Sequence, residues 1–232
     1  MSTSLRLDIA GRELVMAVRR SGTARRMSLR MTPGGVVVVV PMGVPLAEAE
    51  RFAHHQRDWI AGRLDATPER IALAPGVELP FMGIAHTISH QPTARRGVWA
   101  EEGRINVSGG AEHVARRVES FLRDEARLVL AHRSRILAEG IGRRVNRVSV
   151  RDTRSRWGSC TAAGDLSFSW RLILAPAWIL DYVVAHEVAH LAEMNHGPGF
   201  WRLVETLTGD PKPARSWLKS HGPGLHRYGL SA

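Results

Sequence analysis

Three histidines and a glutamate in the last quarter of the chain constrain its fold more than any other feature. His186, Glu187 and His190 form the pattern His-Glu-x-x-His, and His196 follows six residues later. On an α-helix, His186 and His190 lie one turn apart on the same side, so both imidazoles can reach one ion. Glu187 lies on the same half of the helix, where a general base would contact a water on that ion. The sequence therefore predicts a helix that carries a metal site.

A catalytic zinc ion usually has three protein ligands and one open position, so a third ligand is required. His196 cannot reach the ion from a continuous helix, because six residues rise about 9 Å along the axis. Asn195 and the Gly-Pro-Gly run at residues 197–199 favour a helix break between about residue 193 and residue 198. His196 could then turn back to the ion. Glu193 is the alternative ligand, since it would share a face with the other two histidines if the helix continued.

Cysteine content, apolar runs and charge limit the classes of protein to which this chain can belong. Cys160 is the only cysteine in 232 residues, which excludes an intrachain disulfide and a cysteine-rich zinc module. The longest apolar run, residues 36–40, is too short to cross a bilayer. No signal sequence is recognisable, so we expect a cytoplasmic protein that does not bind membranes. The formal charge of +10 comes mostly from arginine, often in pairs, which fits either a solvated surface or contact with nucleic acid or nucleotides.

Periodicity along the chain predicts an α+β fold in two parts. The first part, residues 1–110, is expected to contain small antiparallel β-sheets and one helix at about residues 46–64. The second part, residues 111–232, is expected to be the catalytic domain and to open with a long helix at residues 111–139. The tail after residue 221 contains three glycines and a proline, so little regular structure is expected there. No internal repeat is expected.

A β-hairpin is predicted just before the metal-binding helix. Apolar residues alternate at residues 148–150 on its first strand and at residues 166–172 on its second. Residues 161–165 have the composition of the turn between them.

The segment between these two strands has an unusual composition, with Arg154, Arg156 and Trp157 close together. Either these residues form a solvated strand end with a packed tryptophan, or they form the rim of an active-site cleft that binds substrate. Tyr182, on the metal-binding helix, also lies either at the cleft or in solvent. Arg156, Tyr182 and Tyr228 are the candidate partners for an oxyanion.

An ordered set of motifs connects residues 148–201 to a known family. These are the runs RWGSC at residues 156–160, FSWRL at 168–172, DYVVAHE at 181–187, NH at 195–196 and FW at 200–201. Together they closely resemble the YgjP-like metallopeptidase-domain family of zincins. The resemblance implies a zincin-like catalytic core in which His186, His190 and His196 hold Zn²⁺ and Glu187 is the catalytic acid–base.

Three functional hypotheses follow from these observations. The leading one is a zinc metallopeptidase that acts on a peptide or protein substrate, with water activated by Glu187. The second is a metal-dependent hydrolase of nucleotides or phosphate compounds, with Arg154, Arg156 or Arg171 as phosphate clamps. The third is a nucleic-acid-associated protein with a structural metal site, whose nucleic-acid binding would be sensitive to salt.

Overall fold

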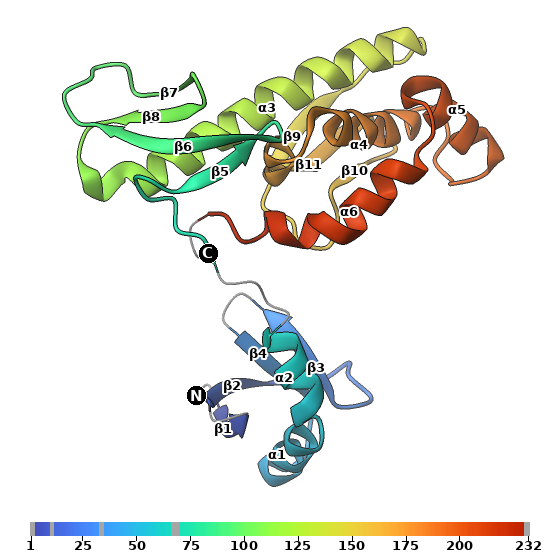
Figure 1. Ribbon diagram of the computed structural model, residues 1–232. Helices are drawn as coiled ribbons and strands as arrows, with labels where there is room; N and C mark the ends of the chain where they lie inside the picture. The colour runs from blue at the N-terminus through green and yellow to red at the C-terminus, as the bar shows by residue number, and fades with distance from the viewer. Residues whose placement is uncertain (1–2, 10–11, 33–34, 66–69, 230–232) are drawn as a thin grey trace. The chain divides into compact units, whose positions relative to one another are not determined.

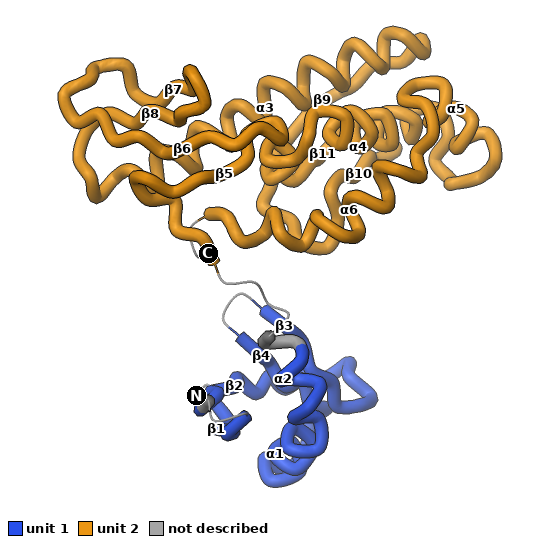
Figure 2. The backbone as a smooth tube through the Cα atoms, viewed as in Figure 1, with its two compact units in different colours: residues 1–69, 231–232 blue, residues 70–230 orange. Residues whose placement is uncertain are grey.

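The computed structural model describes residues 3–9, 12–32, 35–65 and 70–229, and the chain forms two compact units (Figure 2). The first unit comprises residues 1–69 with 231–232, and the second comprises residues 70–230. The boundary between the units therefore lies near residue 70, whereas the sequence pattern placed it at residue 110. The difference arises because strands between residues 78 and 108 share a hydrophobic core with the helix that follows them.

The first unit contains a four-stranded sheet followed by two helices (Figure 1). Alternate residues such as Leu5, Leu7, Met16 and Val38 are buried in its core. The single helix expected at residues 46–64 is interrupted at Gln56, whose ψ of 13° departs from the helical value. The elements are β1 (Thr3–Ile9), β2 (Arg12–Ser21), β3 (Ser28–Thr32), β4 (Gly35–Pro41), α1 (Leu46–His55) and α2 (Arg57–Asp65).

The second unit begins with another four-stranded sheet, which packs on a long helix (Figure 1). The buried residues of this helix recur every four residues from Val114 to Ala138. Because four residues turn a helix by about 400°, the buried stripe advances by about 40° at each step and winds around the axis. One helix can therefore pack on two different layers. The elements are β5 (Glu78–Phe81), β6 (Ile84–Gln91), β7 (Val98–Glu101), β8 (Arg104–Ser108), the 3-10 turn η1 (Ala111–His113) and α3 (Val114–Gly140).

The two four-stranded sheets share one topology, with strand orders β1-β2-β4-β3 and β5-β6-β8-β7. In each, the two central strands are parallel and the outer pairs are antiparallel, so the expectation of purely antiparallel sheets is wrong. The connection between the second and third strands also reads Thr-Ala-Arg-Arg in both, at residues 23–26 and 93–96. The chain therefore contains a duplicated four-stranded element, contrary to the expectation that it holds no repeat.

A three-stranded sheet lies next to the helix that carries His186 and Glu187, with strand order β10-β11-β9. β10 (Gly158–Cys160) and β11 (Asp165–Ser169) form an antiparallel hairpin, whereas β9 (Arg147–Arg151) is parallel to β11. The expected hairpin between residues 148–150 and 166–172 is therefore wrong. The turn after Cys160 connects β10, and not β9, to β11. After β11 the chain forms the 3-10 helix η2 (Trp170–Leu174). β10 is left at the edge of the sheet.

Three helices complete the second unit: α4 (Ala177–Ala189), α5 (Pro198–Thr208) and α6 (Lys212–Leu225). α4 is apolar on every side, with Ile179, Val184 and Val188 all fully buried, as expected for a helix inside a core. The prediction of little regular structure after residue 221 is wrong. α6 continues through Pro223, and Tyr228 then forms a β-bridge to Ile71.

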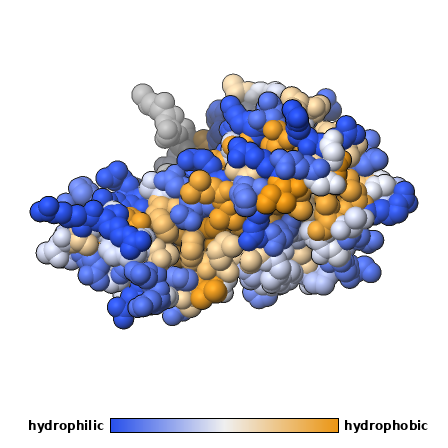
Figure 3. Space-filling view, turned by 90° about the horizontal axis from the view of Figure 1, so that it is seen from above, coloured by the Kyte–Doolittle hydropathy of each residue, from blue (hydrophilic) through white to orange (hydrophobic). Residues whose placement is uncertain are grey.

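Within the described ranges, no helix is long and apolar enough to cross a membrane. One face of the molecule nevertheless shows apolar residues gathered in a band between hydrophilic ones (Figure 3). Large apolar side chains that stay exposed on α3 and α4 include Leu128, Ile136 and Trp178. Ile136 and Trp178 line a surface pocket of about 490 Å³, and none of the three predicted histidine ligands lines it.

Candidate metal centre

The three predicted histidine ligands converge in the second unit, where one ring nitrogen from each lies within 4.8 Å of the others. The Nε2 atoms of His186 and His196 are 3.1 Å apart. Two nitrogens bound to a tetrahedral zinc ion, each about 2.0–2.1 Å from it, would be separated by about 3.3–3.4 Å. The donor type of all three residues and the spacing of the His186–His196 pair therefore fit a tetrahedral ion with three protein ligands and one open position.

The helix break that brings His196 to the other two histidines comes earlier than the expected break at residues 193–198. α4 ends at Ala189, and His190 is its C-terminal cap. The following residues form a tight turn, in which the Glu193 N–H donates to the Ala189 carbonyl at 2.9 Å. The chain then enters α5 at Pro198. The short segment between the two helices folds His196 back over the end of α4.

Glu193 contacts the histidine cluster through its backbone carbonyl and not through its carboxylate. Its carbonyl accepts a hydrogen bond from His190 Nδ1 at 3.1 Å, which leaves the lone pair of His190 Nε2 free for an ion. The Glu193 side chain is exposed. Among the described residues, the cluster of potential ligands contains only the three histidines. The structure therefore groups His196, rather than the Glu193 carboxylate, with His186 and His190.

Phe200, in the first turn of α5, packs against all three imidazoles. Its ring centroid lies 4.9 Å from that of His186, 4.5 Å from that of His190 and 4.7 Å from that of His196. Phe200 is fully buried, so its position is fixed by the core. Trp201 stacks on the outer side of His196 at 5.8 Å. These two aromatic residues restrict the rotation of the imidazoles and hold their nitrogens together.

Glu187 is the only buried carboxylate beside the cluster among the described residues, with an exposed fraction of 5%. Burial raises the pKa of its carboxyl group to about 7, although the positive charge of Arg156 acts in the opposite direction. Burial also lowers the pKa of His186 to about 4, helped by the charges of the other two histidines. At neutral pH the His186 imidazole is therefore unprotonated, and Glu187 is close to the midpoint of its titration.

A pocket of about 230 Å³ opens beside these residues. Three of the four residues predicted for the cleft lie in its wall, whereas Arg154 does not. Arg154 lies instead near His226, whose pKa is lowered to about 4 by burial and by the charges of Arg171 and Arg154. The pocket is lined by Arg156, Trp157, Gly158, Tyr182, Val183, His186, Glu187 and Leu218.

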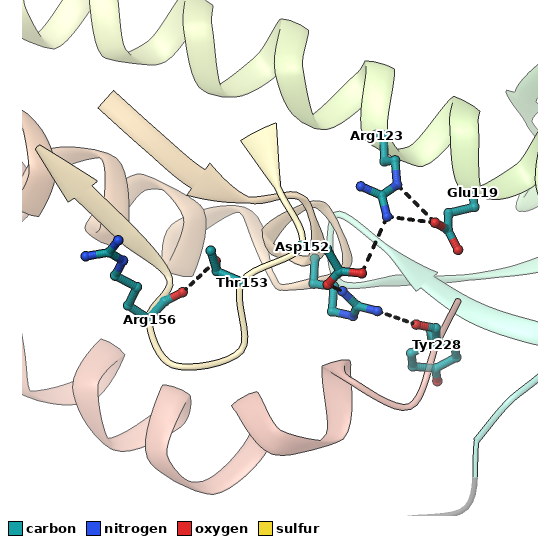
Figure 4. Close-up of polar contacts among 7 residues, drawn as sticks. Glu119, Arg123, Asp152, Thr153, Arg156 and Tyr228 are labelled. Carbon is teal, nitrogen blue, oxygen red and sulfur yellow. Dashed lines mark hydrogen bonds and ion pairs between the residues drawn. The ribbon is translucent and has the colours of Figure 1, made fainter. Parts of the chain in front are cut away.

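The loop at residues 152–157 is anchored at its start by an ion pair between Asp152 and the buried side chain of Arg171 (Figure 4). Arg171 is only 2% exposed and binds the Asp152 carboxylate, and it also donates to the Tyr228 carbonyl at 3.2 Å. Arg123 extends this network, with contacts of 2.8 Å to Glu119 and 3.4 Å to Asp152. Tyr228, a candidate oxyanion partner, is therefore held in this network and does not line the pocket. We call these five residues the Asp152 network.

The far end of the loop presents its side chains to the pocket. The Thr153 hydroxyl donates to the Arg156 carbonyl at 3.0 Å, and the Arg156 side chain points away from the Asp152 network (Figure 4). Trp157 stacks on His226 with 5.2 Å between ring centroids. Gly222 allows this packing, because a Cβ at that position would lie 2.8 Å from the indole. The C-terminal segment, in which little regular structure was expected, therefore positions the wall of the pocket.

Comparison with known proteins identifies the family. The model of the family described as YgjP-like, metallopeptidase domain, matches residues 25–221. The chain belongs to this family. No curated protein matches the chain. Among solved structures, the crystal structure of the metallopeptidase zymogen of Pyrococcus abyssi abylysin is similar over 44% of this chain and 99% of that chain, with 18% identity and a TM-score of 0.37.

Membership of the YgjP-like family confirms the resemblance drawn from the motifs. With the three-histidine cluster, it supports a metal-dependent, peptidase-like role for this chain.

Two residues of the motifs have structural roles that the sequence pattern did not predict. Phe200 contacts every potential ligand, and Arg171, expected as a phosphate clamp, is the buried partner of Asp152. His221 and His226 stack on tryptophans and do not join the cluster.

Proposed function

We propose that this YgjP-like protein is a zinc-dependent peptidase, with His186, His190 and His196 as ligands and Glu187 as the general acid–base. The convergence of three imidazole nitrogens beside a buried carboxyl group carries the proposal. When bound, zinc would polarise the scissile carbonyl and acidify the attacking water. Glu187 would take a proton from that water and pass it to the leaving amine, because a carboxyl group with a pKa of about 7 can both accept and return a proton at neutral pH.

The edge strand β10 supports a peptide substrate. β10 pairs with β11 on one side, and its other side has no strand partner within the described residues. Gly158 of this strand lies against Glu187, since a Cβ there would be 2.5 Å from Glu187 Oε1. An extended peptide that added to the free side of β10 through backbone hydrogen bonds would therefore run past the proposed base.

The phosphate-hydrolase alternative has less support from the arginines on which it relied. Arg171 is buried and bound to Asp152, and Arg154 does not line the pocket beside Glu187. Arg156 is the one arginine of the three in that wall. A single guanidinium beside the Glu187 carboxyl group lacks the converging cationic donors that a phosphate group requires. The pocket is thus better suited to a peptide side chain.

Metal analysis and substitutions test the proposal. The purified protein should contain about one zinc-class ion per chain, and His186→Ala should lose it. Glu187→Gln should keep the ion and reduce peptide hydrolysis by about 10²–10⁴-fold, because it removes only the proton acceptor. Glu193→Gln is the matched control, since it removes an exposed carboxylate and keeps the carbonyl that orients His190. Its metal content and turnover should equal those of the wild type.

Two results would contradict the proposal. The first is full peptide hydrolysis by the Glu187→Gln variant. The second is a purified protein without an ion whose activity does not respond to His186→Ala. Hydrolysis of nucleoside triphosphates in place of peptides, abolished by Glu187→Gln, would replace the peptidase with a phosphate hydrolase.

A further inference from the structure

A second pocket, of about 400 Å³, lies at the His190 end of the histidine cluster. The pocket beside Glu187 includes Gly158, the first residue of β10, whereas the second pocket includes Thr161, which directly follows the last residue of β10. A peptide paired with β10 would advance by about 3.3 Å per residue. It would therefore pass from one pocket to the other within about three residues.

The second pocket is basic. Arg143 and Arg144 line it together with His190, and no acidic residue lines it among those that the structure describes. Both arginines are exposed, and no ion pair or side-chain hydrogen bond joins either guanidinium to another residue in the described part of the chain. Glu139 borders a neighbouring depression that the same arginines also line, and it lies outside this pocket. Within this pocket, no described carboxylate offsets the charge of the two arginines.

The backbone that carries the two arginines is fixed on both sides. At the end of α3, Gly142 has a φ of +66° and the Arg143 N–H donates to the Ala138 carbonyl at 2.8 Å, which is the pattern of a Schellman cap. Two residues beyond Arg144, the Asn146 N–H donates to the Gly164 carbonyl at 3.0 Å. The arginines are therefore held at a set position relative to the turn that follows β10.

On the basis of the proposed peptidase function, we propose that Arg143 and Arg144 form a subsite for an acidic side chain of the substrate. A guanidinium pairs with a carboxylate through two parallel hydrogen bonds, and two guanidinium groups carried on a fixed backbone favour such a partner. Leu191 and Met194 in the same wall offer apolar contact to the methylene groups of a glutamate. The acidic residue would lie two or three positions from the scissile bond, on the His190 side.

Matched peptides test the subsite. Each pair of peptides carries either Glu or Gln at one position near the cleaved bond and is otherwise identical. At one of these positions, kcat/KM should be about tenfold higher for the Glu peptide than for the Gln peptide. The double variant Arg143→Ala, Arg144→Ala should lose this preference, so that kcat/KM for the Glu peptide equals that for the Gln peptide. Arg144→Glu should invert the preference towards Lys. Arg104→Ala, which removes another exposed arginine, on β8, is the control and should keep the preference for Glu.

Binding measured without turnover separates the subsite from the proposed function. The Glu187→Gln variant should bind a fluorescent Glu peptide about tenfold more tightly than the Gln peptide, and the two added alanines should remove the difference. If peptides are cleaved with no preference for Glu, or if the preference survives the double variant, the subsite is refuted and the peptidase stands. If no peptide is cleaved but this selective binding is observed, the peptidase is refuted and the anion site stands.

Discussion

Replacing Gly158 with alanine should remove most of the activity and leave the metal centre intact. A Cβ at residue 158 would lie 2.5 Å from Oε1, 2.6 Å from Cγ and 2.7 Å from Cδ of Glu187, whereas ordinary contacts begin at 3.4 Å. The carboxylate or the strand must therefore move by about 0.7–0.9 Å. Because Cγ lies near the root of a buried side chain, rotation of the carboxylate alone does not relieve the overlap.

The magnitude follows from this displacement. Moving a catalytic group by about 1 Å costs on the order of 10²-fold in rate, so we expect kcat/KM to fall by about that factor. The overlap should also destabilise the fold by about 1–3 kcal/mol, as overpacking does elsewhere. The φ of Gly158 lies outside the left-handed region, so the substitution adds no backbone strain. The loss of activity therefore reports the contact with Glu187.

The assay compares Gly158→Ala with Gly140→Ala, a control at the end of α3 where an added Cβ meets no atom within 4 Å. For both variants, kcat/KM on the best peptide substrate, zinc content and thermal unfolding would be measured. The control should match the wild type in all three. A Gly158→Ala variant with wild-type kcat/KM would refute the reasoning. Loss of zinc would also refute it, because residue 158 is not among the potential ligands.

Three further predictions concern stability. Asp152→Ala should lower the free energy of unfolding by about 2–3 kcal/mol, because it leaves the buried Arg171 without its carboxylate, and Asp152→Ala with Arg171→Met should restore part of this loss in urea titrations. His226 has a pKa of about 4 in the folded protein against an ordinary value of 6.5, so the unfolded chain takes up its proton first and stability falls as the pH is lowered from 6.5 to 4. His226→Phe should reduce this loss by about 1–2 kcal/mol in unfolding curves at the two pH values, because phenylalanine keeps the stack and does not titrate. Zinc at about a hundred times its Kd should stabilise the fold by about 2.7 kcal/mol, and the rise in melting temperature should disappear in His190→Ala.

The helix that carries His186 and Glu187 could be predicted from the sequence because its signals are local. The spacing of His186 and His190 fixes their common face, and Asn195 with the Gly-Pro-Gly run at residues 197–199 indicates that the helix breaks before His196 can bind. The position of the break could not be predicted as well. α4 ends at Ala189, whereas the residues that disfavour a helix lie at 195–199. The hydrogen bond from His190 to the Glu193 carbonyl helps to stabilise this early turn, and no residue pattern encodes it.

Pairing between distant segments could not be read from the sequence. β10 has three residues and no alternation, so the turn that follows it was assigned to the stronger pattern at residues 148–150. Arg171 illustrates a second limit. A continued strand would have placed it on a face opposite to Trp170, in solvent. Instead, the 3-10 helix buries both side chains, and the buried guanidinium is neutralised by Asp152, which lies nineteen residues earlier.

One physical cause accounts for the protonation states that the proposed chemistry requires. Burial on the apolar helix α4 disfavours charge, so it raises the pKa of Glu187 and lowers that of His186. Neutral imidazoles have no proton to lose when they bind a cation, and a carboxyl group near the midpoint of its titration can carry a proton in either direction. Buried polar groups are costly without partners. The Nε2 atoms of His186 and His196 face each other at 3.1 Å, and a divalent cation held between the three rings would give these nitrogens a partner. Such an ion would account for the polar side chains His186 and Glu187 on a core helix.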